Sequence, residues 1–166
     1  MSKQVLFEEK QQFRQPSEWI ILSGLSLFFT YGLIKQVFFG IDFGTTPIPD
    51  IVLILIWLIF AVGFPLAIWK ATLITRVYSE SIGITFFPLK LNEEIIGFDQ
   101  IFKVEATTYH PVLEYGGYGI KTSAKGKVYN VHGKKGVKLW LKSNRPILIG
   151  SQHSDELCRI LRIKIE

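Results

Sequence analysis

The chain has 166 residues and a net charge of +5 at pH 7, a length that allows one ordinary domain and little more. Its mean hydropathy of +0.28 is high for a soluble protein with this many charges, so the apolar residues must be concentrated in part of the chain. The single cysteine, Cys158, excludes an internal disulfide, and the three histidines lie about twenty residues apart without metal-ligand spacing. We therefore predict no metal and no cofactor.

Basic and apolar residues occupy different parts of the chain. Fifteen of the 19 Lys and Arg residues lie in residues 70–166, together with nine of the 14 acidic residues. This part therefore carries an excess of six positive charges. The apolar residues are concentrated before it.

Two apolar runs predict membrane-spanning helices, over residues 19–39 and 51–69. The first contains "WIILSGLSLFFTYGLI" and reaches Phe39 past one charge, Lys35, whose long side chain can extend to the headgroups. Its 21 residues cover about 30 Å as a helix, the thickness of the hydrocarbon core. The second, "IVLILIWLIFAVGFPLAIW", has no charge, and Pro65 predicts a kink. Since no ionisable residue lies in the middle of either span, a transporter is not favoured.

The charges that flank the spans predict their orientation. The loop at 40–50, "GIDFGTTPIPD", has two carboxylates and no Lys or Arg, whereas basic residues precede the first span and follow the second. The positive-inside rule then places both termini in the cytoplasm. We predict a cytoplasmic tail at 1–18, an external loop at 40–50 and a cytoplasmic domain at 70–166.

The segment after residue 70 changes to short β-type runs separated by turn residues. In "GVKLWLKSN", Val137, Leu139 and Leu141 alternate with Lys138, Trp140 and Lys142, as in a half-buried antiparallel sheet. An amphipathic helix with a stripe of Leu157, Ile160, Leu161 and Ile165 is predicted from Ser154. "LNEE" is predicted to cap a turn or short helix. We predict seven antiparallel strands, over residues 72–79, 82–88, 101–109, 115–123, 127–132, 137–142 and 146–150.

Seven antiparallel strands followed by one helix is the order of a pleckstrin-homology (PH) fold. With two preceding spans, the chain resembles small bacterial membrane proteins that carry a PH-like domain. The closer likeness, to an uncharacterised family that covers essentially the whole chain, is carried by "FGIDFGTTPIPD", "FFPLKLNEEIIGFDQI", "LEYGGYG", "YNVHGKKGVKLWL" and "ILIGSQHSDEL". The resemblance implies a mostly-β PH-like domain after two transmembrane helices, in the bacterial inner membrane. It implies no activity.

A glycine-tyrosine element follows Glu114, formed by Tyr115, Gly116, Gly117, Tyr118 and Gly119. It lacks the Lys-Ser/Thr ending and the following helix of a phosphate-binding loop. Two interpretations remain. The glycines allow a bulge or bend across which an aromatic ring packs, or the tyrosines line a small binding notch.

Residues 121–145 contain several basic residues and no Asp or Glu. Near an anionic membrane each would gain about 1 kcal/mol, so they are candidates for binding anionic lipid headgroups or a protein partner. Alternatively they form the solvated faces of hairpins and protect strand edges. Nucleic acid is not favoured, because aromatic residues are not interleaved as a stacking platform. The candidate residues are Lys121, Lys125, Lys127, Lys134, Lys135, Lys138 and Lys142.

No catalytic set is predicted. Glu93, Glu94 and Asp99 lie close in sequence without a His or hydroxyl placed to complete one. Our first hypothesis is a non-enzymatic, membrane-anchored interaction or assembly module that docks a partner protein or a copy of itself. The alternatives are a sensor of anionic lipid headgroups and an accessory subunit of a membrane enzyme or transporter.

Overall fold

The computed structural model describes residues 4–46, 48–143 and 145–165. The chain forms two compact units. One is Phe13–Lys70, and the other combines the residues before Phe13 with those from Ala71 onward.

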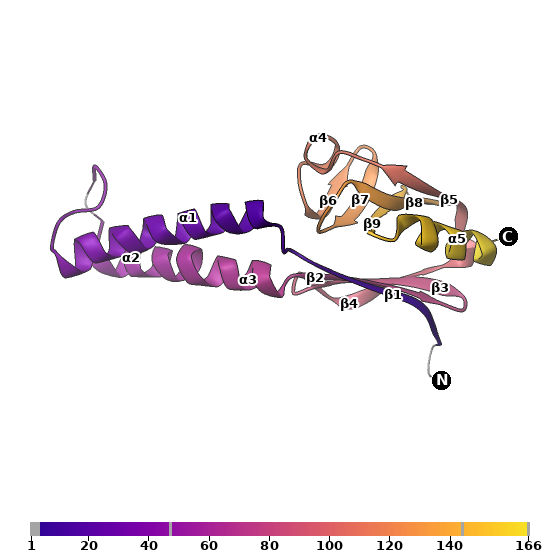
Figure 1. Ribbon diagram of the computed structural model, residues 1–166, viewed down its shortest axis with the longest axis horizontal. Coiled ribbons are helices and arrows are strands. Elements are labelled where there is room, and N and C mark those ends of the chain that lie inside the picture. The colour runs from indigo at the N-terminus through magenta and orange to yellow at the C-terminus, as the bar shows by residue number, and fades with distance from the viewer. Residues whose placement is uncertain (1–3, 47, 144, 166) are drawn as a thin grey trace. The chain divides into compact units, whose positions relative to one another are not determined.

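The unit Phe13–Lys70 is a pair of helical runs, Pro16–Phe38 and Asp50–Lys70 (Figure 1). Both are long and apolar enough to span a membrane, which confirms the two long apolar helices predicted from the sequence. Their segments are α1 (Pro16–Leu33), the π-helical turn η1 (Ile34–Phe38), α2 (Asp50–Trp57), the π-helical turn η2 (Leu58–Gly63) and α3 (Phe64–Lys70).

Pro65 lies just after η2, so the second run changes its hydrogen-bond register directly before the proline. Proline lacks an N–H and crowds the preceding turn, and a π-helical turn is a common way for a helix to accommodate such a disruption. The helical run nevertheless continues to Lys70.

Polar side chains join the two helical runs. Trp57 Nε1 donates a hydrogen bond to Thr30 Oγ1 at 2.9 Å, and Ser26 Oγ donates one to the carbonyl oxygen of Ala61 at 3.2 Å. In an apolar surrounding, hydrogen bonds of this kind fix which faces of two helices meet.

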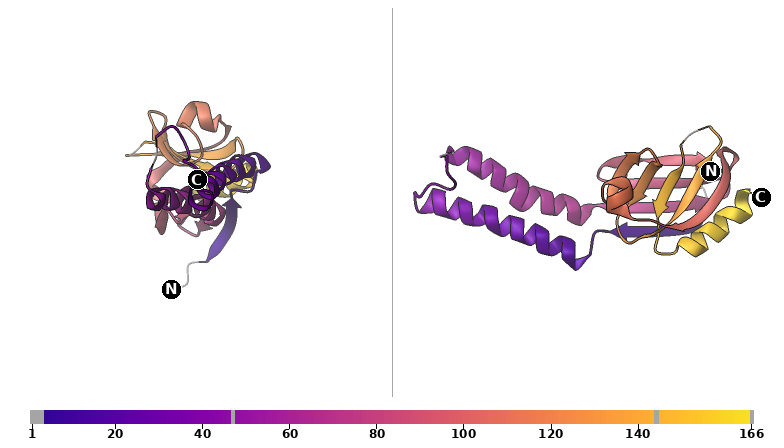
Figure 2. Two further views of the ribbon diagram at one scale, coloured as in Figure 1. Left: turned by 90° about the vertical axis from the view of Figure 1, so that its left-hand side faces the viewer. Right: turned by 90° about the horizontal axis from the view of Figure 1, so that it is seen from above.

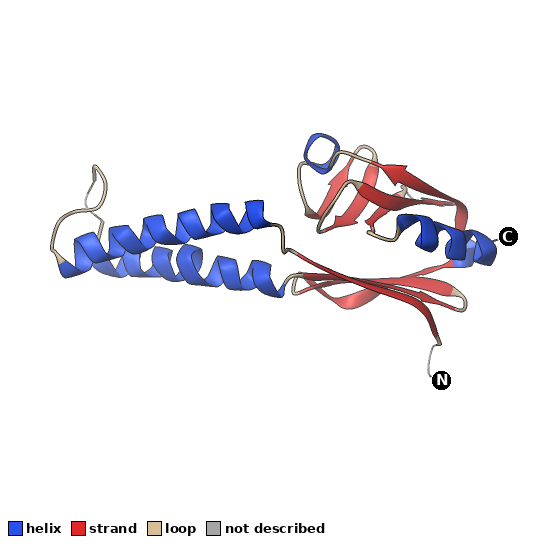
Figure 3. Cartoon of the chain, in the orientation of Figure 1, coloured by secondary structure: helices blue, strands red, loops and turns tan. Residues whose placement is uncertain are grey.

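The other unit contains two β-sheets, drawn in red in Figure 3, and a C-terminal helix. The four-stranded sheet has the order β1-β2-β3-β4, and the five-stranded sheet has the order β5-β8-β9-β7-β6. Figure 1 shows them as two layers. The strands are β1 (Val5–Gln12), β2 (Thr72–Tyr78), β3 (Ser81–Phe87), β4 (Lys90–Gly97), β5 (Ile101–Thr108), β6 (Gly119–Ser123), β7 (Gly126–Asn130), β8 (Lys135–Leu141) and β9 (Ile147–Gly150). The short helix η3 (Phe98–Gln100) joins the sheets.

The prediction of seven antiparallel strands is therefore wrong in number and partly in direction. Two additional strands, β1 and β4, complete the first sheet, and β7 pairs with β9 in parallel. The other pairings in both sheets are antiparallel.

Strand β1 comes from the segment predicted as an N-terminal tail. It pairs with β2 from Val5↔Tyr78 to Gln12↔Thr72. Both helical runs therefore lie, in sequence, between two strands that are neighbours in one sheet. The helical hairpin is an insertion into this sheet.

Strand β4 replaces the turn or short helix predicted at "LNEE". It pairs with β3 across a hairpin whose turn is Pro88 and Leu89. The polar run is compatible with a strand because Glu94 is partly buried and hydrogen-bonds to the other sheet, as described below.

The core lies between the sheets and under helix α5 (Ser154–Ile165). In this helix Leu157 and Leu161 are fully buried, and Cys158 extends the apolar stripe. The helix packs on β5 and β8. This arrangement confirms the predicted C-terminal amphipathic helix. The largest buried side chains of the sheets include Leu73, Ile82, Ile84, Phe86, Tyr129, Leu139 and Ile149.

Two polar side chains of β1 point inward and fasten the first sheet to the end of β9. Glu9 is 7% exposed and accepts hydrogen bonds from Ser151 Oγ at 2.6 Å and from the backbone N–H of Gln152 at 2.8 Å. Gln11 Nε2 donates to the carbonyl oxygen of Gly150 at 2.7 Å. The N-terminal strand is thus tied to both sheets.

We expect Glu9→Ala to destabilise the β-domain by about 2 kcal/mol, because it leaves the buried Ser151 hydroxyl and the Gln152 amide without their acceptor. In the full-length chain in detergent, hydrogen exchange in β9 and α5 should accelerate about 30-fold, the equivalent of that energy. Mass spectrometry of these peptides measures it.

Glu8→Ala is the matched control, since the neighbouring carboxylate faces outward and pairs with Lys10 at 3.0 Å and Arg76 at 2.6 Å. Exposed ion pairs contribute little, so exchange should change little. Equal acceleration in both variants would contradict the role given to Glu9.

Candidate binding cleft on the five-stranded sheet

Strand β8 presents two different faces. Val137 and Leu139 are fully buried, whereas Lys138 and Trp140 are half-buried on the opposite face. This confirms the alternation predicted for the strand. Cross-strand pairing places Lys103 of β5 opposite Trp140 and Leu148 of β9 opposite Lys138.

A short helix, α4 (Pro111–Tyr115), occupies the start of the predicted strand 115–123, and β6 begins only at Gly119. Pro111 is suited to the first turn of a helix, where its missing N–H costs nothing. Gly116 ends the helix in the left-handed conformation (φ 74°), and its N–H donates to the carbonyl oxygen of Val112 at 3.0 Å. Gly116 is therefore explained by the left-handed backbone conformation that ends the helix.

Tyr115 packs into the domain's own surface. It forms a small buried cluster with Tyr109, Val128 and Leu148, and the two tyrosine rings meet edge to face with centroids 6.0 Å apart. Tyr118, the other tyrosine of the element, is half-buried.

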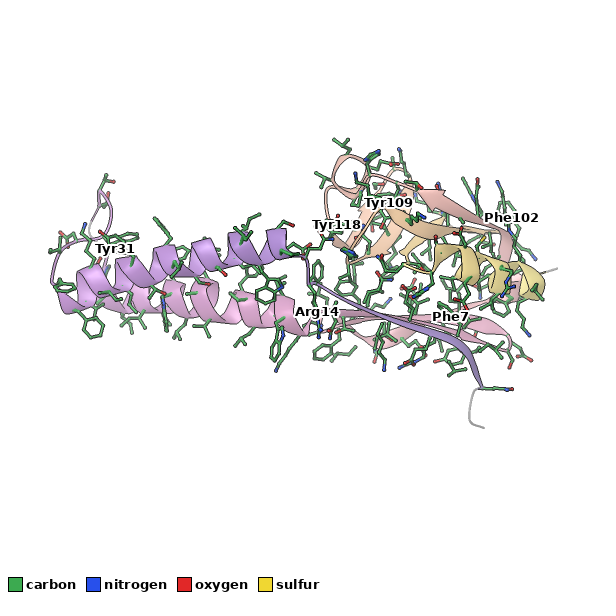
Figure 4. The ribbon with its side chains drawn as sticks, in the orientation of Figure 1. Phe7, Arg14, Tyr31, Phe102, Tyr109 and Tyr118 are labelled. Atoms are coloured by element: carbon green, nitrogen blue, oxygen red, sulfur yellow. The ribbon has the colours of Figure 1, made fainter. Side chains whose placement is uncertain are left out.

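Tyr109 passes over a glycine of β9. A Cβ added at Gly150 would lie 3.0 Å from Tyr109 Oη, tighter than most real contacts. Burial raises the pKa of Tyr109 to about 12. The sequence suggested that an aromatic ring packs across a glycine of the glycine-tyrosine element. The structure shows such a contact, but the ring is that of Tyr109 and the glycine is Gly150 of β9. Figure 4 places Tyr109 and Phe102 toward opposite ends of β5.

A cleft of about 480 Å³ opens beside this cluster, which we call the Trp140 cleft. Segments distant in sequence form it: the end of β5, helix α4, the β6–β7 turn, β8 and β9. Figure 2 shows these elements on the five-stranded sheet. The lining residues are Thr107, Thr108, Tyr109, Glu114, Tyr115, Ala124, Lys125, Lys138, Trp140, Pro146 and Leu148.

The cleft combines an aromatic wall with cations. Lys138 Nζ lies 4.3 Å from the centroid of the Trp140 ring, and Lys103 Nζ lies 5.9 Å from it. Both separations allow cation–π attraction. Among the other lining residues, Lys125 Nζ pairs with Glu114 Oε2 at 2.7 Å, and this ion pair lowers the pKa of Glu114. The arrangement suits a ligand with an apolar or planar group for the ring and an anionic group for Lys138.

A second group of charges joins the two sheets around Glu94. Its carboxylate accepts hydrogen bonds from Lys127 Nζ at 2.8 Å, from Lys90 Nζ and from the Tyr129 hydroxyl. Burial alone would raise the pKa of Glu94, but these three donors hold it at about 2. Burial, together with the same carboxylate, raises the pKa of Tyr129. This group is a structural link between β4 and β7.

The structure brings together some of the residues proposed from the sequence and separates others. Lys125, Lys138 and Tyr115 line the Trp140 cleft, and Lys127 is engaged by Glu94. Lys121 is exposed on β6, while Lys134 and Lys135 lie at the start of β8 and Lys142 just past its other end. The seven lysines therefore do not form one continuous row. Gly117 and Gly119 have positive φ, 125° and 108°, like Gly116.

Trp140 is the functional candidate that the sequence reasoning missed. Trp140 follows Leu139 in the alternating pattern, so its side chain was expected on the outward, lysine-bearing face. An aromatic side chain is uncommon on such a face. Its neighbours in the cleft come from five separate segments, so their convergence had no local signal.

One family model matches the chain over residues 2–164, and its description is "Family of unknown function (DUF6141)". This confirms the expected membership in an uncharacterised family along nearly the whole chain. No curated protein matches the chain.

We expect Glu94→Gln to lower the stability of the β-domain at pH 7 by about 1 kcal/mol, a figure reduced for the solvent that reaches the carboxylate. Because the folded pKa of about 2 lies below the ordinary value of 4.5, the wild-type chain keeps this contribution above pH 4.5. It loses the contribution as the pH falls toward 2. The difference between wild type and variant should therefore shrink with acidification in thermal unfolding at several pH values.

Glu80→Gln, at an exposed carboxylate in the β2–β3 turn, is the control. Its difference from wild type should stay close to zero over the same range. A difference for Glu94→Gln that stays constant between about pH 7 and pH 3 would refute the proposed coupling.

Proposed function

The chain belongs to the DUF6141 family of unknown function, and we propose that it is a non-enzymatic, membrane-anchored binding module whose β-domain holds a segment of a partner protein in the Trp140 cleft. The observation that carries the proposal is the cleft itself. It joins a half-buried tryptophan to lysines in a preformed hollow of about 480 Å³, which lies within the size range of ligand sites.

Two features support membrane anchoring. The helical runs have 23 and 21 residues, and only 17% and 6% of their most apolar windows is buried. The exposed remainder is apolar and suits lipid. The absence of Lys and Arg from residues 40–50 in the sequence supports cytoplasmic termini. We accordingly propose a multi-pass protein of the bacterial inner membrane.

A PH-like β-domain is part of the proposal. In its favour are a first sheet that is a four-stranded meander, a second sheet packed against it, and a helix at the end of the chain. Helix α4 and the parallel β7–β9 pair are additions to that plan. The helical hairpin would then be an insertion between the first two strands.

The chemistry of the cleft favours a peptide segment with an apolar or aromatic side chain next to an Asp or Glu. The ring of Trp140, with Pro146 and Leu148, provides the apolar surface. Lys138 offers its ammonium group to the carboxylate, while Lys125 is already paired with Glu114. Tryptophan is also among the residues that contribute most to protein–protein binding.

A lipid sensor that uses all seven lysines has less support. Lys127 and Lys125 are paired with Glu94 and Glu114, and the remainder are spread over different ends of the strands. The role of an accessory subunit is compatible with the same cleft, since the partner would then be a membrane enzyme or transporter.

Site-directed photo-cross-linking in native membranes tests the proposal. A photoreactive residue at Ala124, which is exposed in the lining of the cleft, should give an adduct with a discrete protein. Trp140→Ala and Lys138→Glu should each reduce its yield about tenfold or more, as expected for residues worth over 1.4 kcal/mol.

Two controls make this test specific. Phe102→Ala removes an exposed aromatic side chain of β5 outside the cleft and should leave the adduct unchanged. A photoreactive residue at Thr85, on the four-stranded sheet, should not give the same adduct. If Trp140→Ala leaves the yield intact, or if both positions capture the same protein, the cleft is not the binding site.

A further inference from the structure

The turn between β3 and β4 exposes an apolar tip that the proposed function does not use. Phe87 is 39% exposed, Leu89 is 73% exposed and Leu91 is 69% exposed. Pro88 is exposed between them. We call Phe87–Leu91 the hairpin tip.

The register of the first sheet places this tip at a particular end of the domain. Gln12 pairs with Thr72, and Thr72 pairs with Phe87, so the three residues form one row across three strands. Gln12 is the last residue of β1 before the helices, and Thr72 is the first residue of β2 after them. Both connections to the helical hairpin therefore leave the end of the sheet at which the β3–β4 hairpin turns.

Chain geometry bounds the separation of the tip from the end of the second helical run. Two residues separate Lys70 from Thr72, at most ~7 Å, and one strand spacing of ~5 Å separates Thr72 from Phe87. The tip is thus within ~20 Å of the point at which the chain would leave the membrane. The headgroup region on each side of the hydrocarbon core is ~5–8 Å thick.

From this row and this exposure we infer that the hairpin tip contacts the lipid headgroup region of the leaflet from which the helices emerge. The inference rests on the membrane anchoring included in the proposed function. The bilayer is the occupant best suited to the tip, because the covalent connections keep this apolar segment within ~20 Å of the membrane surface. Insertion would remove the side chains of Phe87, Leu89 and Leu91 from water, the driving force of interfacial binding.

Basic residues next to the row fit the same environment. Arg14 lies in the connection between β1 and the first helical run, and Lys70 directly precedes the connection to β2. Long basic side chains beside apolar ones are typical of segments at an anionic membrane surface.

Fluorescence quenching of the full-length chain in lipid nanodiscs tests the inference. Leu89→Cys would carry an environment-sensitive fluorophore, with Leu113→Cys as the matched control, because Leu113 is an 85% exposed leucine on α4. The native Cys158 is 4% exposed, so the unsubstituted chain serves as the labelling blank. Nitroxide-bearing lipids report contact with the bilayer, and iodide reports contact with water.

At Leu89 we expect quenching by shallow nitroxide lipids about threefold stronger than at Leu113, and quenching by iodide about threefold weaker, as for a side chain in the headgroup region. Equal iodide quenching at both positions would overturn the inference. So would protection from iodide without quenching by lipid, which would mean that a partner protein or a second copy covers the tip.

A label at Ile59→Cys in the second helical run separates this inference from the membrane anchoring on which it depends. Ile59 is 59% exposed in an apolar helix and should be quenched by nitroxides deep in the acyl chains. If Ile59 is quenched and Leu89 is not, the hairpin contact alone is wrong. If neither is quenched, the anchoring is also wrong.

Discussion

The pairing of Gln12 with Thr72 is the constraint on which the rest of the structure depends. It holds the two connections to the helical hairpin one strand spacing apart, ~5 Å, whereas packed helices have axes 8–10 Å apart. Residues 13–15 join β1 to the first helical run, and Ala71 joins the second helical run to β2. Each helical run is therefore joined directly to one of two neighbouring strands, and removal of β1 would leave only the second run directly joined to the sheet.

Buried polar groups hold the two sheets in a fixed arrangement. Glu9 and Gln11 bind the end of β9 and the residues after it, and Glu94 binds Lys127 and Tyr129 of β7. Apolar packing between sheets has little directionality, whereas a carboxylate with two or three donors is satisfied in one geometry. These bonds therefore contribute to the specificity of the arrangement as well as to its stability.

The helical runs, helix α5 and the alternation of β8 could be predicted because apolar side chains set their patterns. Strands β1 and β4 could not, since polar residues such as Glu9, Gln11 and Glu94 face inward and invert the usual pattern. Helix α4 carried a signal, a proline at its start and a glycine after its end, but its five residues are too few for periodicity. The parallel β7–β9 pair and the Trp140 cleft depend on contacts between segments that are distant in the sequence. Local sequence patterns do not report such contacts.

With the proposed contact at the hairpin tip, the row Gln12, Thr72 and Phe87 would help a small domain with short connections to keep a defined orientation. The two connections are one strand spacing apart, ~5 Å. Attachment points this close together give only weak resistance to tilting of the sheet. A contact at the hairpin tip extends the same row past β3 to β4, so the separation of the attachment points grows to about three strand spacings, ~15 Å. The torque that a given force at the membrane exerts grows in the same proportion. Anchoring at the hairpin tip would thus orient the domain, and with it the Trp140 cleft, without any lengthening of the connections.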